Sequence, residues 1–259
     1  MFRHIVGLLV IVGALVVVLA LSSVPMALSQ MEQAQPVYTY VSQFQVPRAN
    51  WAQYAEDTEK IFDPIAEKFM ADGTIIAWST FETVVHTPEG YTNGAAWSSN
   101  SIAGLTRVLD ELRKAGPRPG QLASTKHEDF LMQSTMHHAV SGHWTSGYLR
   151  VVCQLAKPDK PDDYAAALTK YLGATFDEQF KKGVATSYGL DQQYVNNNAP
   201  SLRCFVVTYP DAETMDKWAT AINATLGKMS AADREAFFGT TVSNSRRDFM
   251  ARLTHYAHK

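Results

Sequence analysis

Seven polar side chains of this chain have types and spacings that could do chemistry together. They occur in segments whose residues are typical of β-strands, at positions that alternate along each strand and would therefore share one face of a sheet. The seven residues are Gln43, Gln133, His137, Arg150, Gln154, Arg252 and Tyr256.

His137, Arg252 and Tyr256 are the candidate catalytic residues, and Arg150 with the three glutamines are the candidate ligand-binding residues. A histidine can act as a general base near neutral pH or as an axial ligand to haem. Two arginines can hold a carboxylate or a phosphate through paired hydrogen bonds, so Arg150 and Arg252 predict an anionic ligand. Tyr256 and the glutamines would orient that ligand.

Interpretations without a function for these residues stay open. A half-buried histidine such as His137 is often a hydrogen-bonded structural residue. Either arginine could form an internal ion pair with Glu82 or Asp191, because an unpaired buried charge is costly. Both arginines could also lie in water at the rim of the site.

The histidines do not indicate a metal site. His137 and His138 are adjacent in a predicted strand, so they point to opposite faces of the sheet. His143 could fold back toward one of them, but no Cys, Asp or Glu completes a ligand set at the usual spacing. We therefore predict no metal ion, and we leave the cofactor open between none and haem.

The elements that must position these residues occur twice in the chain. Residues 38–112 and 149–222 follow the same pattern, about 110 positions apart. Asp129 and Asp248 begin the last strand of each copy and are 119 positions apart, so the second copy has gained about nine residues. Other matches are Tyr54 with Tyr164, Gly73 with Gly183, Trp78 with Tyr188, and the pentapeptide from Tyr40 with the one from Val151.

Each copy predicts the element order β-α-β-β-α-β. β-Branched and aromatic residues mark the strands, and apolar residues at helical spacing mark the helices. Pro64 lies inside the first predicted helix and should bend or break it. Strands are predicted at 37–46, 75–86, 94–98, 129–138, 148–156, 184–194, 202–209 and 248–256, and helices at 50–73, 102–116, 162–182, 211–226 and 231–238.

Strand alternation sorts the side chains of each strand into two faces. We assign the apolar sets, such as Phe249, Ala251 and Leu253, to the core beneath the helices. The more polar sets, which contain the seven residues above, then belong to the opposite face. A shift of one residue in any strand would invert the assignment for that strand.

Two fused β-α-β-β-α-β units, each with the element order of the ferredoxin-like fold, resemble the dimeric α+β barrel superfamily. The resemblance rests on element order and duplication over nearly the whole chain after residue 29, and not on a diagnostic motif. It implies an α+β protein whose two fused ferredoxin-like units pack sheet to sheet as a pseudo-dimeric barrel. A cavity between the two sheets is the expected binding site.

The superfamily that this chain resembles does not imply a single chemistry. It includes cofactor-free monooxygenases, isomerases and lyases, haem enzymes such as chlorite dismutase, and proteins that only bind. Its haem members use a histidine on one side of the haem and an arginine on the other. His137 with Arg252 is superficially similar to that pair, although the surrounding motif does not match residue by residue.

The N-terminus has the layout of a secretory signal peptide. Arg3 precedes an uncharged apolar run from Ile5 to Leu21, and small residues follow Pro25. An uncleaved membrane anchor is the alternative, because the apolar run is long for a signal. In either case the folded part would lie outside the cytoplasm. The predicted organisation is a signal peptide at 1–29, a first unit at 37–138, a linker at 139–147 and a second unit at 148–259.

Charge and cysteine content limit the partners and the compartment. The net charge is −2 and no long basic run is present, which argues against nucleic acid as a partner. Cys153 and Cys204 are an even pair in a chain that we expect to be exported, so they could form a disulfide. Two small buried core residues are the alternative.

Three functions fit these observations. The first is binding of a small, anionic organic molecule between the two sheets, either in a cofactor-independent enzyme or in a binding protein. The second is haem binding or a haem-dependent oxidoreductase in the same cavity. The third is a structural protein whose solid barrel mediates contacts, since small barrels are commonly filled by side chains. The sequence leaves open whether the chain is an enzyme and whether it assembles into oligomers.

Overall fold

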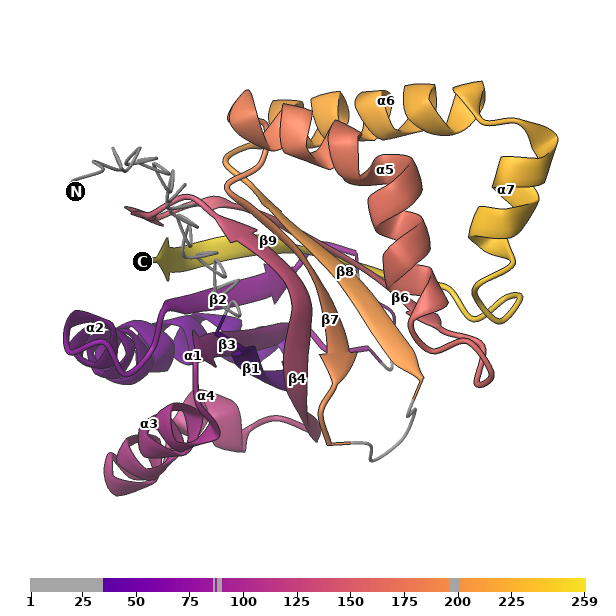
Figure 1. The fold of residues 1–259 in the computed structure, drawn as a ribbon. Coiled ribbons are helices and arrows are strands. Elements are labelled where there is room, and N and C mark those ends of the chain that lie inside the picture. The colour runs from indigo at the N-terminus through magenta and orange to yellow at the C-terminus, as the bar shows by residue number, and fades with distance from the viewer. Residues whose placement is uncertain (1–34, 86, 88–89, 196–200) are drawn as a thin grey trace, which may run out of the picture. The chain divides into compact units, whose positions relative to one another are not determined.

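The computed structural model describes residues 35–85, 87, 90–195 and 201–259 (Figure 1). The predicted signal peptide at 1–29 lies outside these ranges. None of the helices in the described ranges is both long enough and apolar enough to cross a membrane.

The first half of the described chain has the expected β-α-β-β-α-β order. Its strands are β1 (Val37–Gln45), β2 (Ala77–Thr83), β3 (Asn93–Ser99) and β4 (Lys126–Ala139). Its helices are a 3₁₀ turn (Arg48–Asn50), α1 (Trp51–Asp57), a π-helical turn (Thr58–Phe62), α2 (Asp63–Ala71), α3 (Ile102–Lys114) and α4 (Pro119–Leu122).

The second half repeats that order after a short strand, β5 (Gly142–Trp144), which lies in the segment expected to be a linker. The inserted residues form the predicted short helix, α7. The strands are β6 (Gly147–Leu155), β7 (Ser187–Gln193), β8 (Leu202–Tyr209) and β9 (Arg247–His258), and the helices are α5 (Asp163–Lys181), α6 (Ala212–Lys228) and α7 (Ala231–Phe238).

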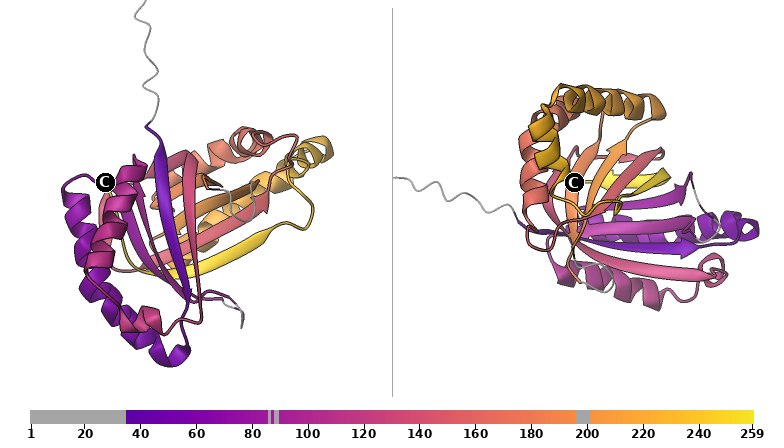
Figure 2. Two further views of the ribbon diagram at one scale, coloured as in Figure 1. Left: turned by 90° about the horizontal axis from the view of Figure 1, so that it is seen from below. Right: turned by 90° about the vertical axis from the view of Figure 1, so that its right-hand side faces the viewer.

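Pairing between the two halves closes the strands into a barrel. The strand order is β2-β3-β1-β4-β7-β8-β6-β9, and β9 returns to pair with β2, so the two four-stranded halves meet at two antiparallel seams. β5 adds to the end of β9 outside this closed set. The views in Figure 2 place α1–α4 and α5–α7 outside the strands, over the half to which each group belongs. The structure thus confirms two ferredoxin-like units that close on each other.

Three of the four apolar cores among the described residues follow directly from this arrangement. Phe62 and Trp97 anchor the core between the sheet and the helices of the first half, and Phe176 anchors the equivalent core of the second half. The third core fills part of the barrel interior, where Phe81 and Leu253 are each no more than 3% exposed. Apolar side chains therefore form a large part of the wall of the barrel interior.

Two irregularities in the seams reverse the side-chain alternation along β4 and β9. The register between β4 and β7 shifts between Ser134 and Met136, and the register between β2 and β9 shifts opposite Thr80 and Phe81. An extra residue at such a bulge turns the following side chains to the other face. On each of these strands, a residue that faces the barrel interior before the bulge and one that faces it after the bulge are therefore separated by an odd number of positions.

The sequence predicts a bend or a break at Pro64, and the structure shows a local change of helix type there. It follows the π-helical turn Thr58–Phe62, and α2 continues after it. A proline has no N–H for the carbonyl of Lys60, four residues earlier, and its ring would crowd that carbonyl. The wider π turn relieves this conflict without ending the helix.

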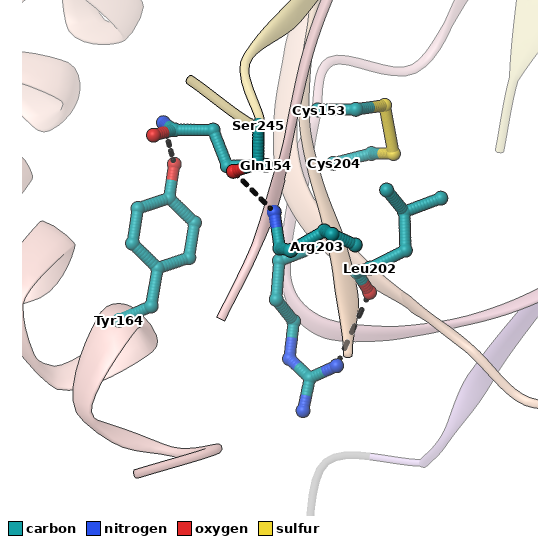
Figure 3. The surroundings of a disulfide bond; sticks show 8 residues. Cys153, Gln154, Tyr164, Leu202, Arg203, Cys204 and Ser245 are labelled. Carbon is teal, nitrogen blue, oxygen red and sulfur yellow. Dashed lines mark hydrogen bonds between the residues drawn. A yellow bond between two sulfur atoms is a disulfide. The ribbon is translucent and has the colours of Figure 1, made fainter. Parts of the chain in front are cut away.

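Cys153 and Cys204 form a disulfide between the neighbouring strands β6 and β8, with 4.0 Å between their Cα atoms (Figure 3). The two residues are directly opposite each other in the strand register, which brings both sulfur atoms to the same face. The adjacent side chain of Gln154 extends away from the disulfide toward Tyr164 (Figure 3). Of the two alternatives from the sequence, the structure shows the disulfide.

Replacing both cysteines by alanine should lower the free energy of unfolding by about 2–4 kcal/mol, because the cross-link restricts the loop between them in the unfolded chain. Urea unfolding with and without a reductant measures this difference. The reductant should bring the wild type to the level of the Cys153→Ala/Cys204→Ala double variant and should not affect that variant. An equal effect on both proteins would contradict the prediction.

Candidate functional site

The barrel encloses a cavity of about 310 Å³. Most of its wall is apolar and comes from both halves of the chain, with Val41, Phe130, Leu149 and Phe249 among the lining residues. A volume of this order suits a small organic molecule. The polar side chains that also line the cavity are Gln43, Ser134, His137, Ser187, Asp191, Thr208, Arg247, Asp248, Tyr256 and His258, with Thr39, Ser79 and Ser98.

Two histidines line one part of this cavity. Burial, followed by the charge of nearby His137, lowers the pKa of His258 to about 4. Both ring nitrogens of His258 are buried and have no hydrogen-bond partner among the described residues. Burial, followed by the charge of His138, also lowers the pKa of His137, so both cavity imidazoles are neutral at pH 7. A neutral imidazole offers one N–H donor and one nitrogen acceptor to a ligand.

Tyr256 is fully buried beside these histidines. Its ring stacks on Trp144 with 4.8 Å between ring centroids, and its hydroxyl lies 3.3 Å from Thr186 Oγ1. Thr186 Oγ1 in turn lies 2.7 Å from Thr208 Oγ1, which lies 2.6 Å from the hydroxyl oxygen of Ser187. Burial raises the pKa of Tyr256, so the phenol stays protonated and acts as a fixed hydrogen-bonding group.

Asp191 is the acidic group that the sequence argument missed as a site residue. It lines the cavity from β7, and the hydroxyl of Ser134 donates to its Oδ1 over 2.6 Å. Burial raises the pKa of Asp191 to about 6, although the hydrogen bond from Ser134 by itself lowers this pKa. A carboxyl group with this pKa can exchange a proton near neutral pH. The signal in the sequence was one acid in a strand otherwise free of charge.

The structure brings together three of the seven predicted site residues. Gln43, His137 and Tyr256 all line the barrel cavity. His137 and Tyr256 reach it because each follows one of the two bulges, which restores the inward direction for these positions. Their catalytic and ligand-binding roles stay predictions.

The inward direction predicted for Arg150 and Gln154 is wrong. Both point outward from the barrel to the side covered by helices, where Arg150 pairs with Asp248 at 2.9 Å and Gln154 donates to Tyr164 at 3.1 Å. The cavity residues of β6 are instead Leu149, Val151 and Cys153. The apolar set of the strand faces inward because the closed barrel is as dry as the helix-covered cores.

The inward direction is also wrong for Arg252 and Gln133. Arg252 is exposed on the outer face of β9, opposite Glu82 in the register of β2. Gln133 lies on the outer face at the seam between β4 and β7, where Gln192 donates to it over 3.3 Å. The two predicted arginines therefore cannot clamp an anion inside the barrel.

A one-residue slip in the repeat explains why the predicted inward face is right for β1 although it is wrong for β6. The helices and glycines of the two copies match at 110 positions, as Tyr54 and Tyr164 show, but the pentapeptide match used 111 positions. The strand registers restore the spacing of 110, since β1 pairs Val41 with Ala96 and β6 pairs Val151 with Val206. Such a shift exchanges the two faces of a strand.

Haem fits the cavity only in part. His137 and His258 could each supply an axial nitrogen, and both rings line the cavity. The similarity of His137 and Arg252 to a haem pair is lost, because Arg252 lies outside the barrel. Among the residues that the structure describes, no group of three or more His, Cys, Asp or Glu side chains could hold a metal ion.

No protein-family model and no curated protein sequence matches this chain. Solved structures match its fold at low identity. A candidate monooxygenase from Fusobacterium nucleatum subsp. nucleatum has a TM-score of 0.64 at 10% identity, and the match covers 88% of this chain and 96% of that one. A candidate monooxygenase from Lactobacillus acidophilus has a TM-score of 0.57 at 12% identity, with 86% and 96% covered.

A candidate chlorite dismutase has a TM-score of 0.50 at 12% identity, and the match covers 85% of this chain and 95% of that chain. The matches span both halves of this chain, so they concern the whole closed barrel and not one ferredoxin-like unit. At these identities the matches show a shared fold, and they give no information about the chemistry of this chain. Residues 35–259 therefore have the dimeric α+β barrel fold of the monooxygenase and chlorite dismutase structures, with both ferredoxin-like units in one polypeptide.

Proposed function

We propose that this protein binds a small, uncharged, mainly apolar organic molecule inside its barrel. The observation that carries the proposal is His258, whose two buried ring nitrogens have no partner among the described residues although the ring lines a cavity. Leaving a buried polar group without a hydrogen bond costs about 1–3 kcal/mol. A ligand hydroxyl or carbonyl group would remove that cost, while the apolar wall takes up the rest of the molecule.

An uncharged ligand agrees with the charges around the cavity. Arg247 is the arginine in the cavity lining, and its guanidinium donates to the backbone carbonyls of Asn244 and Arg246, at 3.3 and 2.8 Å. Asp191 is an acidic group in the same lining and would repel an anion when it is ionised. Asp248 is also in the lining, but its carboxylate pairs with Arg150 and Arg246 on the outer side of the strand. The anionic ligand expected from the sequence depended on Arg150 and Arg252, which lie outside the barrel.

Cofactor-independent proton transfer is compatible with this cavity. Asp191 has a pKa of about 6 and could accept or donate a proton to a bound molecule without a metal ion. His137 would contribute a neutral imidazole on the neighbouring strand. Binding is the function that the geometry supports best, and catalysis at Asp191 would be an addition to it.

Haem in the same cavity is the second candidate, because the imidazoles of His137 and His258 both line the cavity. Bound haem would supply redox or oxygen chemistry at its iron, while this chain would supply an axial nitrogen and an apolar enclosure. Arg247, the arginine of the cavity lining, donates to backbone carbonyls, and Arg252 lies outside the barrel, which weakens this candidate.

We also propose that the protein is exported, on the strength of the N-terminal pattern and of the Cys153–Cys204 disulfide. N-terminal sequencing of the protein recovered from outside the cytoplasm should find Gln30 as the first residue. Recovery of the full N-terminus in a membrane fraction would support the anchor instead, and recovery of reduced protein from the cytoplasm would contradict both.

The barrel proposal predicts a preference for ligands with a hydroxyl group. The wild type should bind 2-naphthol about tenfold more tightly than naphthalene, since one hydrogen bond to a buried group is worth about 1.4 kcal/mol. His258→Phe should remove this preference and retain naphthalene binding. Fluorescence titration of both compounds measures the two affinities.

The matched control is Arg252→Gln, on the same strand but on its outer face, which should change neither affinity. An unchanged preference in His258→Phe would contradict the proposal.

A titration with haem tests the second candidate separately. We expect no Soret shift, and a strong Soret band that disappears in His137→Ala or His258→Phe would favour haem.

Asp191 and His258 should give opposite pH dependences of stability. The pKa of Asp191 is raised from its ordinary value to about 6, so its contribution to the free energy of unfolding is greatest at low pH and is lost as the pH rises through 6. The pKa of His258 is lowered to about 4, so its contribution is present above pH ~6.5 and is lost as the pH falls toward 4.

Urea unfolding of the wild type, Asp191→Asn and His258→Phe from pH 4 to pH 7 measures these contributions. The stability of the wild type relative to Asp191→Asn should decrease by about 2–3 kcal/mol over this range, and its stability relative to His258→Phe should increase by a similar amount. Slopes of the same sign for the two variants would show that one of the two groups is not buried as described.

A further inference from the structure

A second cavity, of about 340 Å³, lies outside the barrel between the helices of the first half and the outer face of β1 and β4. Aromatic rings form much of its wall. Tyr40 stacks on Trp97 with 4.7 Å between centroids, and Phe44 stacks on His127 at 4.3 Å with the two rings 3° from parallel. Tyr54 also lines this cavity. Stacked aromatic walls favour a planar ring as the ligand.

A carboxylate with titratable neighbours lies in the wall of this cavity. His127 Nε2 is 2.9 Å from Asp129 Oδ1 and 3.0 Å from Ser42 Oγ. Burial and a hydrogen bond to Asp129 raise the pKa of Tyr40. In the tautomer that donates from Nε2 to Asp129, Nδ1 of His127 is left as a hydrogen-bond acceptor.

Arg118 adds a positive charge that makes no direct ion pair with a described acidic residue. It lines the cavity, is partly buried, and forms no ion pair with any acidic side chain in the described ranges. The nearby carboxylate of Asp57 accepts from the backbone N–H of Gly120 at 2.6 Å and from Gln53 at 2.9 Å. A partly desolvated guanidinium whose acidic neighbour is hydrogen-bonded elsewhere is costly, and an anionic ligand would supply a direct partner for it.

The second half provides an internal comparison for this cavity. By the strand registers and the spacing of the last strands, Arg150, Arg246 and Asp248 of the second half are equivalent to Tyr40, His127 and Asp129. Asp248 pairs with Arg150 at 2.9 Å and with Arg246 at 2.7 Å. The duplicated carboxylate is therefore held by two permanent cations in one half and by an imidazole and a phenol in the other.

The helix that borders the cavity also differs between the halves. Thr58 and Phe62 line the first-half cavity and belong to the π-helical turn, whereas α5 runs without interruption from Asp163 to Lys181 in the second half. π-Helical turns occur frequently at functional sites. The local distortion, the unpaired arginine and the titratable carboxylate cluster are thus found together in the first half.

We propose that this first-half cavity is a second binding site, for a planar aromatic carboxylate that bears an acidic hydroxyl group. The carboxylate of the ligand lies on Arg118, and its ring packs between Tyr40 and Tyr54. The hydroxyl proton transfers to Nδ1 of His127, which leaves an oxyanion on the ligand and an imidazolium stabilised by Asp129. The proton returns to the same oxygen atom on release, so the step needs no oxidant or co-reactant.

Calorimetric titration with 4-hydroxybenzoate tests the site in the full-length protein. Wild type should bind 4-hydroxybenzoate at millimolar concentration or below. It should bind 4-hydroxybenzamide, which lacks the charge, at least about tenfold more weakly. Arg118→Gln should lose about the same factor for 4-hydroxybenzoate. His127→Gln should abolish the dependence of the binding heat on the ionisation heat of the buffer, which reports proton transfer.

The matched control is Arg246→Gln, the residue equivalent to His127 in the second half, which should leave 4-hydroxybenzoate binding unchanged. Failure of the wild type to bind 4-hydroxybenzoate at millimolar concentration would overturn the proposal, as would equal binding of the benzamide or an equal loss in Arg246→Gln. If Arg118→Gln does not fold, the comparison of the two ligands on the wild type still decides the role of charge. His258→Phe should not affect binding of 4-hydroxybenzoate. The test of this second site is therefore independent of the test of the barrel ligand.

Discussion

Closure of the sheet is the constraint on which the rest of this structure depends. Each four-stranded half presents one apolar face that its own helices do not cover, and pairing of β4 with β7 and of β9 with β2 removes both faces from water. The wall of the interior that results is mainly apolar, so an ionisable group buried there is favoured in its uncharged form. Asp191 and His258 show this directly, because the pKa of each is displaced toward its uncharged form.

The order of the elements could be predicted from the sequence because it depends on local patterns and on the duplication. β8 coincides with its predicted range of 202–209 and α7 with 231–238. The faces of the strands could not be predicted as reliably, because two apolar environments compete for the apolar residues of every strand. The assignment of Phe249 and Leu253 to the helix-covered core was wrong, since both line or fill the barrel interior.

The candidate site was partly predictable for a related reason. His137 and Tyr256 were placed in the cavity on the basis of simple alternation, but they reach it through bulges that alternation does not contain. The cavity residues Asp191 and His258 could not be recognised as special, because a raised or lowered pKa depends on burial by residues distant in the sequence. Arg118 and His127 likewise line one cavity only because α4 packs on α1 and β4 pairs with β1.

Joining the two units in one polypeptide has a consequence for how the protein can change over time. In a symmetric homodimer every substitution enters both subunits, so an alteration that suits one outer cavity is imposed on its twin. In the fused chain the positions of Tyr40 and Arg150, or of His127 and Arg246, are separate codons and mutate independently. One half can then keep a rigid ion-pair scaffold that maintains stability while the other half explores new chemistry, with the barrel between them shared by both.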